Sequence, residues 1–371
     1  MASGLYLGLI SGTSMDGVDA ALIRLTHDGM ALLAFAETPY PEDLREALEQ
    51  AVRLETLTLE GFGALHVRVG RAFAQAALGL LSSCGISPAE VTAIGSHGQT
   101  LLHKPQANPA FSLQIGDPSL IAYTTGIVTV ADFRAKDIAA HGQGAPLVPP
   151  FHQFALGGGE RGLAVLNIGG IANITLFPDN APVLGFDTGP GNTLMDLWIR
   201  LHRGESFDRD GSWGRSGVPA AELLEACLAD DYFRQAAPKS SGRDYFNLAW
   251  LRQRLASTTL APLAPHDVQA TLTHLTARSV VAAIAQHLPA CRRLAVCGGG
   301  AKNSFLMDLL GTLLPSASVH STDDLGLPAA AVEACAFAWL AARRLSAEPG
   351  NIPSVTGARR ALVLGGIYAP D

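Results

Sequence analysis

The sequence predicts an α/β protein in which strands alternate with helices and glycine-rich turns join paired strands. Two observations carry this prediction. Apolar runs flank a polar or glycine-rich turn in two segments, Leu7 to Leu25 and Leu163 to Phe177. A strand followed by a helix then recurs through both halves of the chain. We therefore expect two related halves, each with a mostly parallel or mixed sheet.

Composition restricts the class of partner. The chain has 371 residues, 48% of them hydrophobic and 16% charged, which is enough apolar material for two cores. Its net charge is −7, and Lys and Arg are scattered, so we expect a small-molecule partner and no nucleic acid. Apolar runs stop short of the roughly 18 residues that span a bilayer, so we expect no membrane partner.

The N-terminal segment and the cysteines indicate a cellular compartment. The segment MASGLYLGLISG has no positively charged leader, so we interpret it as a first strand. Five cysteines form no Cys-x-x-Cys pair, which is typical of reduced thiols. We expect a cytoplasmic protein.

In the first half, the two opening strands are joined by a turn from Ser11 to Gly17, longer than a two-residue hairpin needs. Helical spacing of apolar residues predicts a helix from about Leu59 to Leu81, with Gly85 as a stop. The segment VTAIGSHGQT predicts a strand, SLQIGDPSLIAYTTG a strand and a helix, and IVTVADFRAKD another strand. Strand and helix alternate here.

In the second half, we expect a strand that ends at Asp187 and a helix that starts near Asn192 or Thr193. A further helix is expected from about Ala270 to His287. Asn303 is placed to cap the helix that follows three glycines, and Pro328 stands near the start of the last helix. The Gly- and Pro-rich segment from Ala139 to Gly162 is a candidate crossover or hinge.

Three glycine-containing turns follow apolar strands. In SGTSMDGVD, Thr13 and Ser14 can donate hydrogen bonds to phosphate, whereas Asp16 and Asp19 need a cation such as water-bridged Mg²⁺. NIGGIAN offers backbone donors, and VCGGGAKN places glycines before a helix N-terminus. Alone, SGTSMDGVD is better explained as an ordinary polar turn, NIGGIAN can be a plain tight turn, and VCGGGAKN is a weak motif. Together they favour a nucleotide site, although the P-loop and dinucleotide fingerprints are absent.

Further polar residues are candidates for chemistry. Asp187, at its expected strand end, suits a general base or a turn-forming aspartate. Glu333 stands in an apolar helix, where it lines a cleft or reaches solvent. Other polar clusters suit a hydroxylated or carboxylated ligand, or else simply face water; they contain His97 and Gln99, Asp132, Arg134 and Asp137, and His141 and Gln143.

Taken together, the motifs resemble one family along nearly the whole chain. They are, in order, ISGTSMDGVD, GSHGQT, VADFRAKDIAAHGQGAPLVP, LNIGGIAN, GFDTGPGN, VCGGGAKN and AVEACAFAWLA. The chain resembles the anhydro-N-acetylmuramic acid kinases, members of the sugar kinase, Hsp70 and actin superfamily. The resemblance implies a two-domain, duplicated ribonuclease H-like fold with an active-site cleft between the domains. We expect domains over residues 1–138 and 139–371, with the final helix and tail packing back on the first.

The resemblance also implies a reaction and roles for residues. The substrates would be 1,6-anhydro-N-acetylmuramic acid, ATP and water, with Mg²⁺, and the products N-acetylmuramic acid 6-phosphate and ADP. Asp187 would be the general base, with Glu333 assisting, and Asp16 would hold the metal through water. The implied ATP-binding residues are Gly12, Thr13, Ser14, Met15, Asp16, Gly17, Val18, Asp19, Gly169, Gly170, Asn173, Gly298, Gly299, Gly300 and Asn303. The implied sugar-binding residues are His97, Gln99, Asp132, Arg134 and Gln143.

Two alternatives stay open. One is a kinase for another sugar or polyol, whose base would deprotonate a substrate hydroxyl. The other is a non-metabolic ATPase switch of the same superfamily, against which the sugar-facing clusters argue. A homodimer is implied by the resemblance alone.

Overall fold

The computed structural model describes all residues except 1–2, 13, 28, 157–161, 238, 243–244 and 260–261. Contacts divide the chain into two compact units. Unit 1 contains Met1–Ala155 and Ala331–Asp371, and unit 2 contains Leu156–Ala330. The division falls after Ala155 and Ala330, not after residue 138, because the rings of Phe151 and Phe154 lie 6.2 and 5.9 Å from that of Trp339. Thr13, expected to bind ATP, lies outside the described residues.

Unit 1 is built on a mixed sheet, seven-stranded over the described residues, with the order β12-β6-β4-β1-β2-β3 and β5 paired with β4. β1, β2 and β3 form an antiparallel meander, and β4 and β6 continue the sheet parallel to β1. The strands are β1 (Gly4–Ser11), β2 (Gly17–Leu25), β3 (Met30–Pro39), β4 (Val91–Lys104), β5 (Phe111–Ile115), β6 (Thr129–Ala131) and β12 (Gly366–Tyr368).

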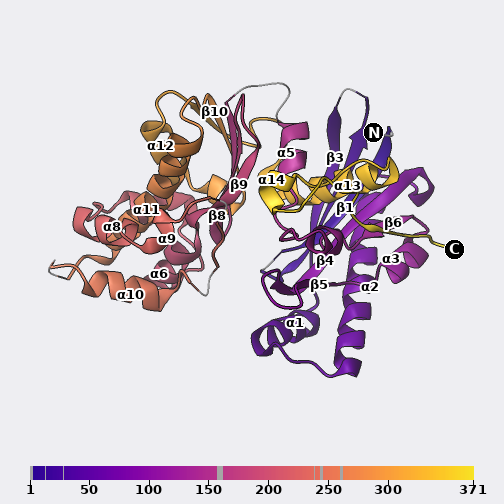
Figure 1. Cartoon of the computed structure of the whole chain (residues 1–371). Coiled ribbons are helices and arrows are strands. Elements are labelled where there is room, and N and C mark those ends of the chain that lie inside the picture. Colours follow the sequence, from indigo (N-terminus) through magenta and orange to yellow (C-terminus); the bar gives the residue numbers. More distant parts are fainter. Residues whose placement is uncertain are drawn as a thin grey trace. The chain divides into compact units, whose positions relative to one another are not determined.

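Helices cover both faces of this sheet. They are α1 (Glu42–Leu54), α2 (Leu59–Ser83), α3 (Pro118–Thr125), α4 (Ala135–Ala139), α5 (Pro149–Ala155), α13 (Val332–Leu345) and α14 (Pro353–Thr356), with a short 3₁₀ turn at Pro88–Glu90. Side chains of α1 and α2 share a buried cluster with Leu7 and Leu9 of β1. In Figure 1 the yellow α13, near the C-terminus, lies alongside the indigo β1 near the N-terminus.

The packing of α13 depends on two glycines. A Cβ added at Gly8 of β1 would lie 1.8 Å from the carbonyl oxygen of Ala334, and one added at Gly95 of β4 would lie 1.9 Å from that of Phe337. Because side chains alternate along a strand, Leu7 and Leu9 face α2 while Gly8 faces α13. The helix backbone therefore rests directly on the sheet.

Unit 2 is built on a second mixed sheet with the order β11-β10-β7-β8-β9. β7, β8 and β9 are antiparallel neighbours, and β10 and β11 run parallel to β7. The strands are β7 (Leu163–Ile168), β8 (Ile171–Phe177), β9 (Leu184–Pro190), β10 (Arg293–Cys297) and β11 (Ser318–Ser321).

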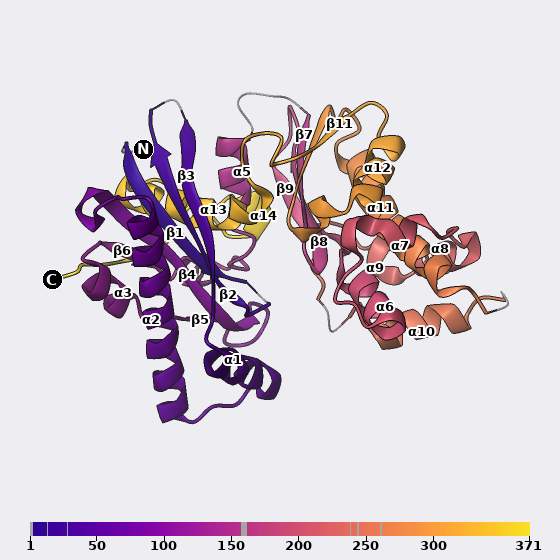
Figure 2. The same cartoon turned by 180° about the vertical axis from the view of Figure 1, so that it is seen from behind.

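The helices of unit 2 bury one large apolar cluster against this sheet, which contains Leu166, Trp198, Phe246, Leu275 and Leu306. Figure 2 shows α6, α7, α8 and α10 gathered on the same part of this unit as α11. The helices are α6 (Thr193–Arg203), α7 (Ser212–Arg215), α8 (Ala221–Leu228), α9 (Asp231–Arg234), α10 (Leu248–Ala256), α11 (Pro265–His287) and α12 (Ser304–Leu313), with 3₁₀ turns at Arg209–Gly211, Gly299–Lys302 and Ala329–Ala331.

The two sheets share one strand order. β6-β4-β1-β2-β3 and β11-β10-β7-β8-β9 are both an antiparallel meander whose first strand is joined by two parallel strands. This confirms the predicted α/β class, the mixed sheets and the two related halves. Among the described residues, no helix is both long enough and apolar enough to cross a membrane.

Most of the helices and strands lie where local sequence patterns predicted them. Both glycine-containing hairpins, the helix near 59–83 and the helix after Asn192 are confirmed. The expectation that this strand ends at Asp187 was wrong, because β9 continues to Pro190 and pairs with β8 on both sides of a register shift at Thr188. The helix expected from about Ala270 begins at Pro265, whose fixed φ suits a first turn.

Candidate active site

Glycine segments that are far apart in the sequence meet in unit 2. The amides of Gly191 and Thr193 donate to the carbonyl of Gly170 at 2.9 and 3.1 Å, and the amide of Asn192 donates to that of Gly169 at 2.8 Å. The Asn192 side-chain amide donates to the Ile168 carbonyl at 3.1 Å. The turn between β7 and β8 is thus tied to the start of α6.

The triple glycine after β10 joins the same place. Gly298 has φ +78°, and a Cβ there would lie 2.3 Å from Asn167 Oδ1; a Cβ on Gly300 would lie 2.3 Å from Ile168 Cγ2. These two glycines are needed for packing. At Gly169 and Gly299 the nearest atom to an added Cβ is 3.7 and 3.8 Å away, so their backbone is open to an approaching ligand.

Asn303 has a structural role at the end of this segment. Its Oδ1 accepts a hydrogen bond from the amide of Leu306 at 3.0 Å, which confirms it as the N-cap of α12. Asn303 is buried, and its Oδ1 lies 2.1 Å from the position of a Cβ added at Gly211. The cap therefore also fixes the turn at Arg209–Gly211 against α12.

A row of polar residues crosses the sheet beside the glycine segments. Asn167 of β7 pairs in register with Asn173 of β8, and Asn173 pairs with Asp187 of β9. Register partners share a face of the sheet, so the row extends from the Gly298 segment to Asp187. The sequence reasoning missed Asn167; the alternation of Asn167 with buried Leu166 and Ile168 was its only signal.

The segment that follows α9 holds Asp187. Its Oδ2 accepts from the amide of Ser241 at 2.9 Å, its amide donates to the carbonyl of Lys239 at 2.9 Å, and its carbonyl accepts from the Tyr232 hydroxyl at 2.6 Å. Burial raises the pKa of Asp187 to about 6, and the Ser241 hydrogen bond opposes that rise. A half-buried carboxyl with this pKa can take up a proton near neutral pH.

A small cavity of about 60 Å³ lies on the other side of β9. Phe186, Thr188, Phe233, Ser279 and His287 are among its lining residues. Phe186 precedes Asp187 in the regularly paired part of the strand, so its side chain points to the opposite face. This cavity is therefore not the space that the Asp187 carboxyl faces.

Unit 1 contains the other expected phosphate turn, between β1 and β2. Ser14 Oγ donates to Asp16 Oδ1 at 2.8 Å, and the Asp16 carbonyl accepts from the Tyr40 amide at 3.0 Å. Met15 has φ +55° and stands at the bend. Gly17 packs against β3, where an added Cβ would lie 2.3 Å from the Thr38 carbonyl oxygen.

An acidic group surrounds Asp19 at the start of β2. Val18 is buried beside it, and burial together with the charges of Glu37, Asp16 and Glu333 raises the pKa of Asp19 to about 7. Such mutual repulsion is relieved by a cation. No three or more His, Cys, Asp or Glu side chains in the described part of the chain are placed to bind a metal directly.

Gln99 anchors the start of this turn. Its Oε1 accepts from the Ser11 hydroxyl at 2.6 Å, and its Nε2 donates to the Gly12 carbonyl at 3.3 Å. Gln99 is buried and lies in β4, next to β1. Gln99, which is predicted to face the sugar, thus supports the turn that is expected to bind phosphate.

His97 and Arg134 form a pair beside Gln99. His97 Nε2 accepts from Arg134 Nε and Nη2 at 3.0 and 2.9 Å, so His97 Nδ1 carries the proton donated to the Gly98 carbonyl at 2.9 Å. Burial and the Arg134 charge hold the pKa of His97 well below its usual value. Burial lowers the pKa of Arg134 to about 10, which leaves the guanidinium charged at neutral pH.

A buried carboxylate holds the loop that supports Arg134. Asp137 accepts from the amide of Gly144 at 2.8 Å, from Asn351 Nδ2 at 2.7 Å and from the Thr356 hydroxyl at 2.8 Å. The Gly144 carbonyl in turn accepts from Arg134 Nη1 at 2.7 Å. The sequence reasoning did not find Asn351 and Thr356, which lie more than 200 residues from Asp137 along the chain.

The remaining expected sugar residues lie around this loop. Asp132 follows β6 and is exposed, with φ +59°, a conformation that non-glycine residues adopt rarely. Gln143 is half-buried, and its amide donates to the Thr356 carbonyl at 2.7 Å. Asp132, Arg134 and Gln143 thus flank the short helix α4.

Glu333 is the second residue of α13 and its side chain is exposed, which matches the alternative that it reaches solvent. Its negative charge nevertheless raises the pKa of Asp19 and opposes the fall in the pKa of Arg134. Glu333 therefore belongs electrostatically to the polar group that contains Asp19 and Arg134.

The candidate residues form two groups, one in each unit. Unit 1 brings together the Gly12–Asp19 turn, Gln99, His97, Arg134 and Glu333. Unit 2 brings together Gly169, Gly170, Asn173, Asp187 and the Gly298–Asn303 segment. A phosphate-type glycine turn beside a carboxyl with a raised pKa is the arrangement of a phosphotransferase that also needs a base.

Comparison with known proteins identifies the family. The family model described as anhydro-N-acetylmuramic acid kinase matches residues 4–370. A protein named anhydro-N-acetylmuramic acid kinase from Xanthomonas campestris pv. campestris (strain 8004) is 50% identical over 370 residues, covering 99% of this chain and 97% of its own. Another with that name, from Xanthomonas oryzae pv. oryzae (strain MAFF 311018), is 49% identical over 368 residues, covering 98% and 97%.

Solved structures are more distant. A ROK family glucokinase from Streptomyces griseus, in complex with glucose and AMPPNP, covers 91% of this chain and 99% of its own, with 14% identity and a TM-score of 0.41. The family match and the two relatives span almost the whole chain at high identity. This protein belongs to the anhydro-N-acetylmuramic acid kinase family.

Proposed function

We propose that this protein is an ATP-dependent kinase that hydrolytically opens 1,6-anhydro-N-acetylmuramic acid and phosphorylates its O6. The products are N-acetylmuramic acid 6-phosphate and ADP, which places the enzyme in peptidoglycan recycling. Relatives with this name at about 50% identity over nearly the full chain support the activity. The observation that carries the mechanism is the position of Asp187, whose half-buried carboxyl stands in a polar row next to the glycine segments.

Asp187 acts as the general base. It removes a proton from water as the water oxygen attacks C1 of the anhydrosugar, and the bond from C1 to O6 breaks. The released O6 attacks the γ-phosphorus of ATP, whose bond to the bridging oxygen of ADP breaks. The raised pKa of about 6 fits this role, because the carboxyl is ionised at neutral pH yet basic enough to accept a proton.

Backbone groups of the glycine segments hold the nucleotide. Gly169, Gly170 and Asn173 face the phosphates, and the segment from Gly298 to Asn303 faces the nucleoside. Open space around Gly169 and Gly299 supports this assignment. Gly12, Ser14, Met15, Gly17 and Val18 shape the other phosphate turn, while Thr13 is assigned to it by resemblance alone.

Asp16 would hold Mg²⁺ through water, and Asp19 would add negative charge beside it. The raised pKa of Asp19 supports a cation at this place, since a nearby positive charge stabilises the ionised carboxyl. When bound, the metal neutralises charge on the phosphates. The chain's own contribution is to align Ser14 and Asp16, which are joined at 2.8 Å.

Unit 1 supplies the sugar-binding residues. Among the described residues, the hydrogen bonds of Arg134 go to uncharged groups, the His97 ring and the Gly144 carbonyl, which supports a role for its charge in binding an anionic group of the ligand. His97, Gln99, Asp132 and Gln143 stand near it in the same unit. The negative charge of Glu333 raises the pKa of Asp19 and of Arg134.

The experiment that tests this function is an assay of Asp187→Asn with MgATP and the anhydrosugar. The variant keeps an oxygen for the Ser241 amide but cannot take up a proton. We expect kcat to fall by about 10² to 10⁴-fold, the usual contribution of a general base. Asp231→Asn, which changes an exposed aspartate in α9, is the matched control. Near-normal turnover by a folded Asp187→Asn variant would refute the base role.

A kinase for an ordinary hexose is the second candidate, because it would use the same kind of base. Product analysis in ¹⁸O-labelled water separates the two. The anhydrosugar reaction puts one labelled oxygen on C1, whereas an ordinary sugar kinase puts none there. That the protein forms a homodimer remains a prediction, which light scattering tests. That it is cytoplasmic also remains a prediction, which cell fractionation tests.

A further inference from the structure

We propose that Asp230 is a positioning residue that holds Asp187, through Tyr232 and the segment that follows α9, in the orientation needed for proton transfer. The proposal rests on the proposed function of Asp187 as a base. It assigns a catalytic consequence to a buried charge that lies outside the predicted site. Three contacts link α10 to Asp187: α10 binds Asp230, Asp230 binds the Tyr232 amide, and the Tyr232 hydroxyl binds the Asp187 carbonyl.

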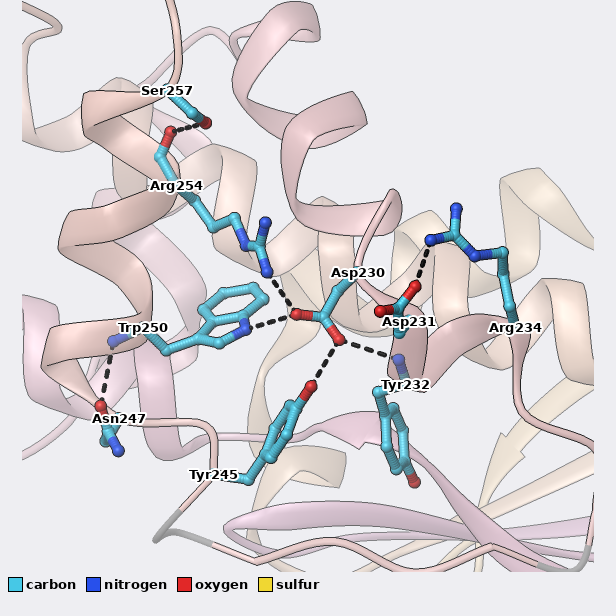
Figure 3. A network of polar contacts seen from close by, with 9 residues as sticks. All are labelled: Asp230, Asp231, Tyr232, Arg234, Tyr245, Asn247, Trp250, Arg254 and Ser257. Carbon is cyan, nitrogen blue, oxygen red and sulfur yellow. Dashed lines mark hydrogen bonds and ion pairs between the residues drawn. The ribbon is translucent and has the colours of Figure 1, made fainter.

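Asp230 is fixed by donors from several parts of unit 2 (Figure 3). One carboxylate oxygen accepts from Trp250 Nε1 at 2.9 Å and from Arg254 Nη2 at 2.5 Å, both on α10. The other accepts from the Tyr245 hydroxyl at 2.7 Å and from the Tyr232 amide at 2.8 Å. The side chain is 4% exposed, so these bonds are shielded from water.

These donors keep Asp230 ionised. Burial alone would raise the pKa of Asp230, but hydrogen bonds from Tyr232, Trp250 and Tyr245 and the charge of Arg254 bring it below its usual value. A buried carboxylate with four donors is held in one rotamer. Asp230 therefore joins the N-terminus of α9 rigidly to α10.

Tyr232 transmits this position to Asp187. Its amide is bound by Asp230, and its hydroxyl donates to the Asp187 carbonyl at 2.6 Å. The Tyr232 ring is buried and packs edge-on against Phe246 at 5.3 Å. A rigid aromatic ring thus spans the distance between the Asp230 network and β9.

The segment after α9 completes the support on the carboxyl side. Lys239 Nζ donates to the Tyr232 carbonyl at 2.9 Å and lies 4.6 Å from the centre of the Tyr232 ring. The Lys239 carbonyl accepts from the Asp187 amide, and the Ser241 amide donates to Asp187 Oδ2, both at 2.9 Å. Asp187 is therefore held at its amide, its carbonyl and one carboxylate oxygen. Tyr232 and Lys239 are linked to Asp230 by hydrogen bonds, and Ser241 follows Lys239 by two residues in the same segment.

A purely structural role would stabilise α9 without affecting turnover by the folded enzyme. The two roles differ in their effect on the Asp187 carboxyl. If the support loosens, the Ser241 hydrogen bond to the ionised carboxyl weakens, and the pKa of Asp187 rises. The acid limb of the kcat/KM profile then moves to higher pH, a change that loss of stability alone does not produce.

Other titratable groups near Asp187 could also shift the acid limb of the kcat/KM profile. The Tyr232 hydroxyl and the Lys239 carbonyl contact the backbone of Asp187. His287 of α11 lines the small cavity beside Phe186 together with Lys239, and its ring lies 5.3 Å from that of Phe186. His287→Gln therefore serves as a control that must leave the acid limb in place.

The experiment compares Tyr232→Phe and Asp230→Asn with Asp231→Asn. Tyr232→Phe removes only the hydroxyl and keeps the packed ring. We expect kcat at neutral pH to fall roughly 10- to 100-fold in both test variants, with the KM for the anhydrosugar changed less, because a displaced catalytic group costs about this much. Asp231, which pairs with exposed Arg234, should give wild-type kinetics (Figure 3).

Double variants distinguish this inference from the proposed function. Tyr232→Phe and Asp230→Asn should not add when combined, and neither should lower the residual rate of Asp187→Asn, because all act through one group. Unchanged kcat and pH profile in folded Tyr232→Phe would overturn the inference while leaving Asp187 as base. Full activity in Asp187→Asn would instead overturn the base itself.

Discussion

The environment of Asp187, the proposed base, predicts the pH dependence of the enzyme. Its pKa is raised from 3.8 to about 6, chiefly by burial. A general base must be ionised to act, so activity requires a pH above this value. We expect kcat/KM for the anhydrosugar to fall about tenfold for each pH unit below about 6. A profile that stays flat down to pH 5 would contradict this prediction.

The same pKa has an effect of opposite sign on stability. Because the folded-state pKa of Asp187 lies above its unfolded value, its contribution to stability is greatest below the unfolded pKa and is lost as the pH rises through about 6. We therefore expect the enzyme to gain activity over the same pH range in which Asp187 contributes less to stability.

Gly299 and Gly298 differ in the space around them, which predicts a ligand-binding role for Gly299 and a packing role for Gly298. An added Cβ there meets no protein atom within 3.8 Å, whereas at Gly298 it meets Asn167 Oδ1 at 2.3 Å. We expect Gly299→Ala to raise the KM for ATP at least several-fold with little change in the urea midpoint. Gly298→Ala should instead lower the midpoint, because φ is +78° there as well. Unchanged ATP kinetics in Gly299→Ala would remove this residue from the nucleotide site.

Sequence reasoning at the residue scale worked where the signal was local. Asn303 could be predicted as an N-cap because the cap and its partner, Leu306, are three residues apart. Asn167 was missed because its role comes from strand register and from the approach of Gly298. The Asp230 network was missed because Trp250 and Arg254 reach it from the next helix.

At the scale of elements, the contact of α13 with the sheet is the most demanding packing in unit 1. A Cβ at Gly95 would lie 1.9 Å from the Phe337 carbonyl oxygen, so the helix would have to move. We expect Gly95→Ala to lower the free energy of unfolding by about 1–3 kcal/mol or more. Urea unfolding followed by circular dichroism measures this change.

Gly79 of α2 is the matched control for Gly95. It is exposed in the middle of a helix, with no atom within 4 Å of an added Cβ. Gly79→Ala should raise the free energy of unfolding by up to about 1 kcal/mol. Equal effects of the two substitutions would show that α13 does not rest on Gly95.

The loop that follows α4 depends on Asp137. Both of its carboxylate oxygens accept hydrogen bonds, from the amide of Gly144, Asn351 Nδ2 and the Thr356 hydroxyl. In an asparagine at this position, the NH₂ group would face one of these donors and could accept no hydrogen bond from it. We expect Asp137→Asn to cost roughly 1–3 kcal/mol of stability, as for a buried group left unpaired. The KM for the sugar should also rise, because Gly144 holds Arg134. Asp308→Asn, an exposed control, should change neither.

Secondary-structure elements could be predicted from the sequence where apolar runs flank a glycine-containing turn, as in the hairpins β1–β2 and β7–β8. The extent of β9 could not, because glycine and proline at 189–190 indicate a turn, whereas pairing with Ile171 and Ala172 keeps the strand extended. Likewise, α5 joins unit 1 through ring contacts with Trp339, which lies nearly 190 residues away. Such contacts leave no local signal.

At the scale of the whole molecule, the two halves share a strand order but differ in how the chain builds them. Unit 2 is one continuous segment, Leu156–Ala330, with its own large core. Unit 1 needs both ends of the chain, because α13 follows unit 2 in sequence yet covers β1, β2 and β4. Unit 1 can therefore be complete only after the last 41 residues, 331–371, have been added.

This construction predicts the effect of ending the chain at Ala330. The truncated chain lacks α13, so the side of the unit 1 sheet that contains Gly8 and Gly95 loses its cover. We expect unit 1 to lose its native transition in urea, whereas unit 2 keeps a cooperative transition visible in the fluorescence of Trp198, Trp213 and Trp250. Removal of residues 366–371 alone takes away only the edge strand β12 and should preserve both transitions. A truncated chain that retains the full circular dichroism amplitude would mean that the sheet of unit 1 is stable without α13, and the glycines at 8 and 95 would then need another explanation.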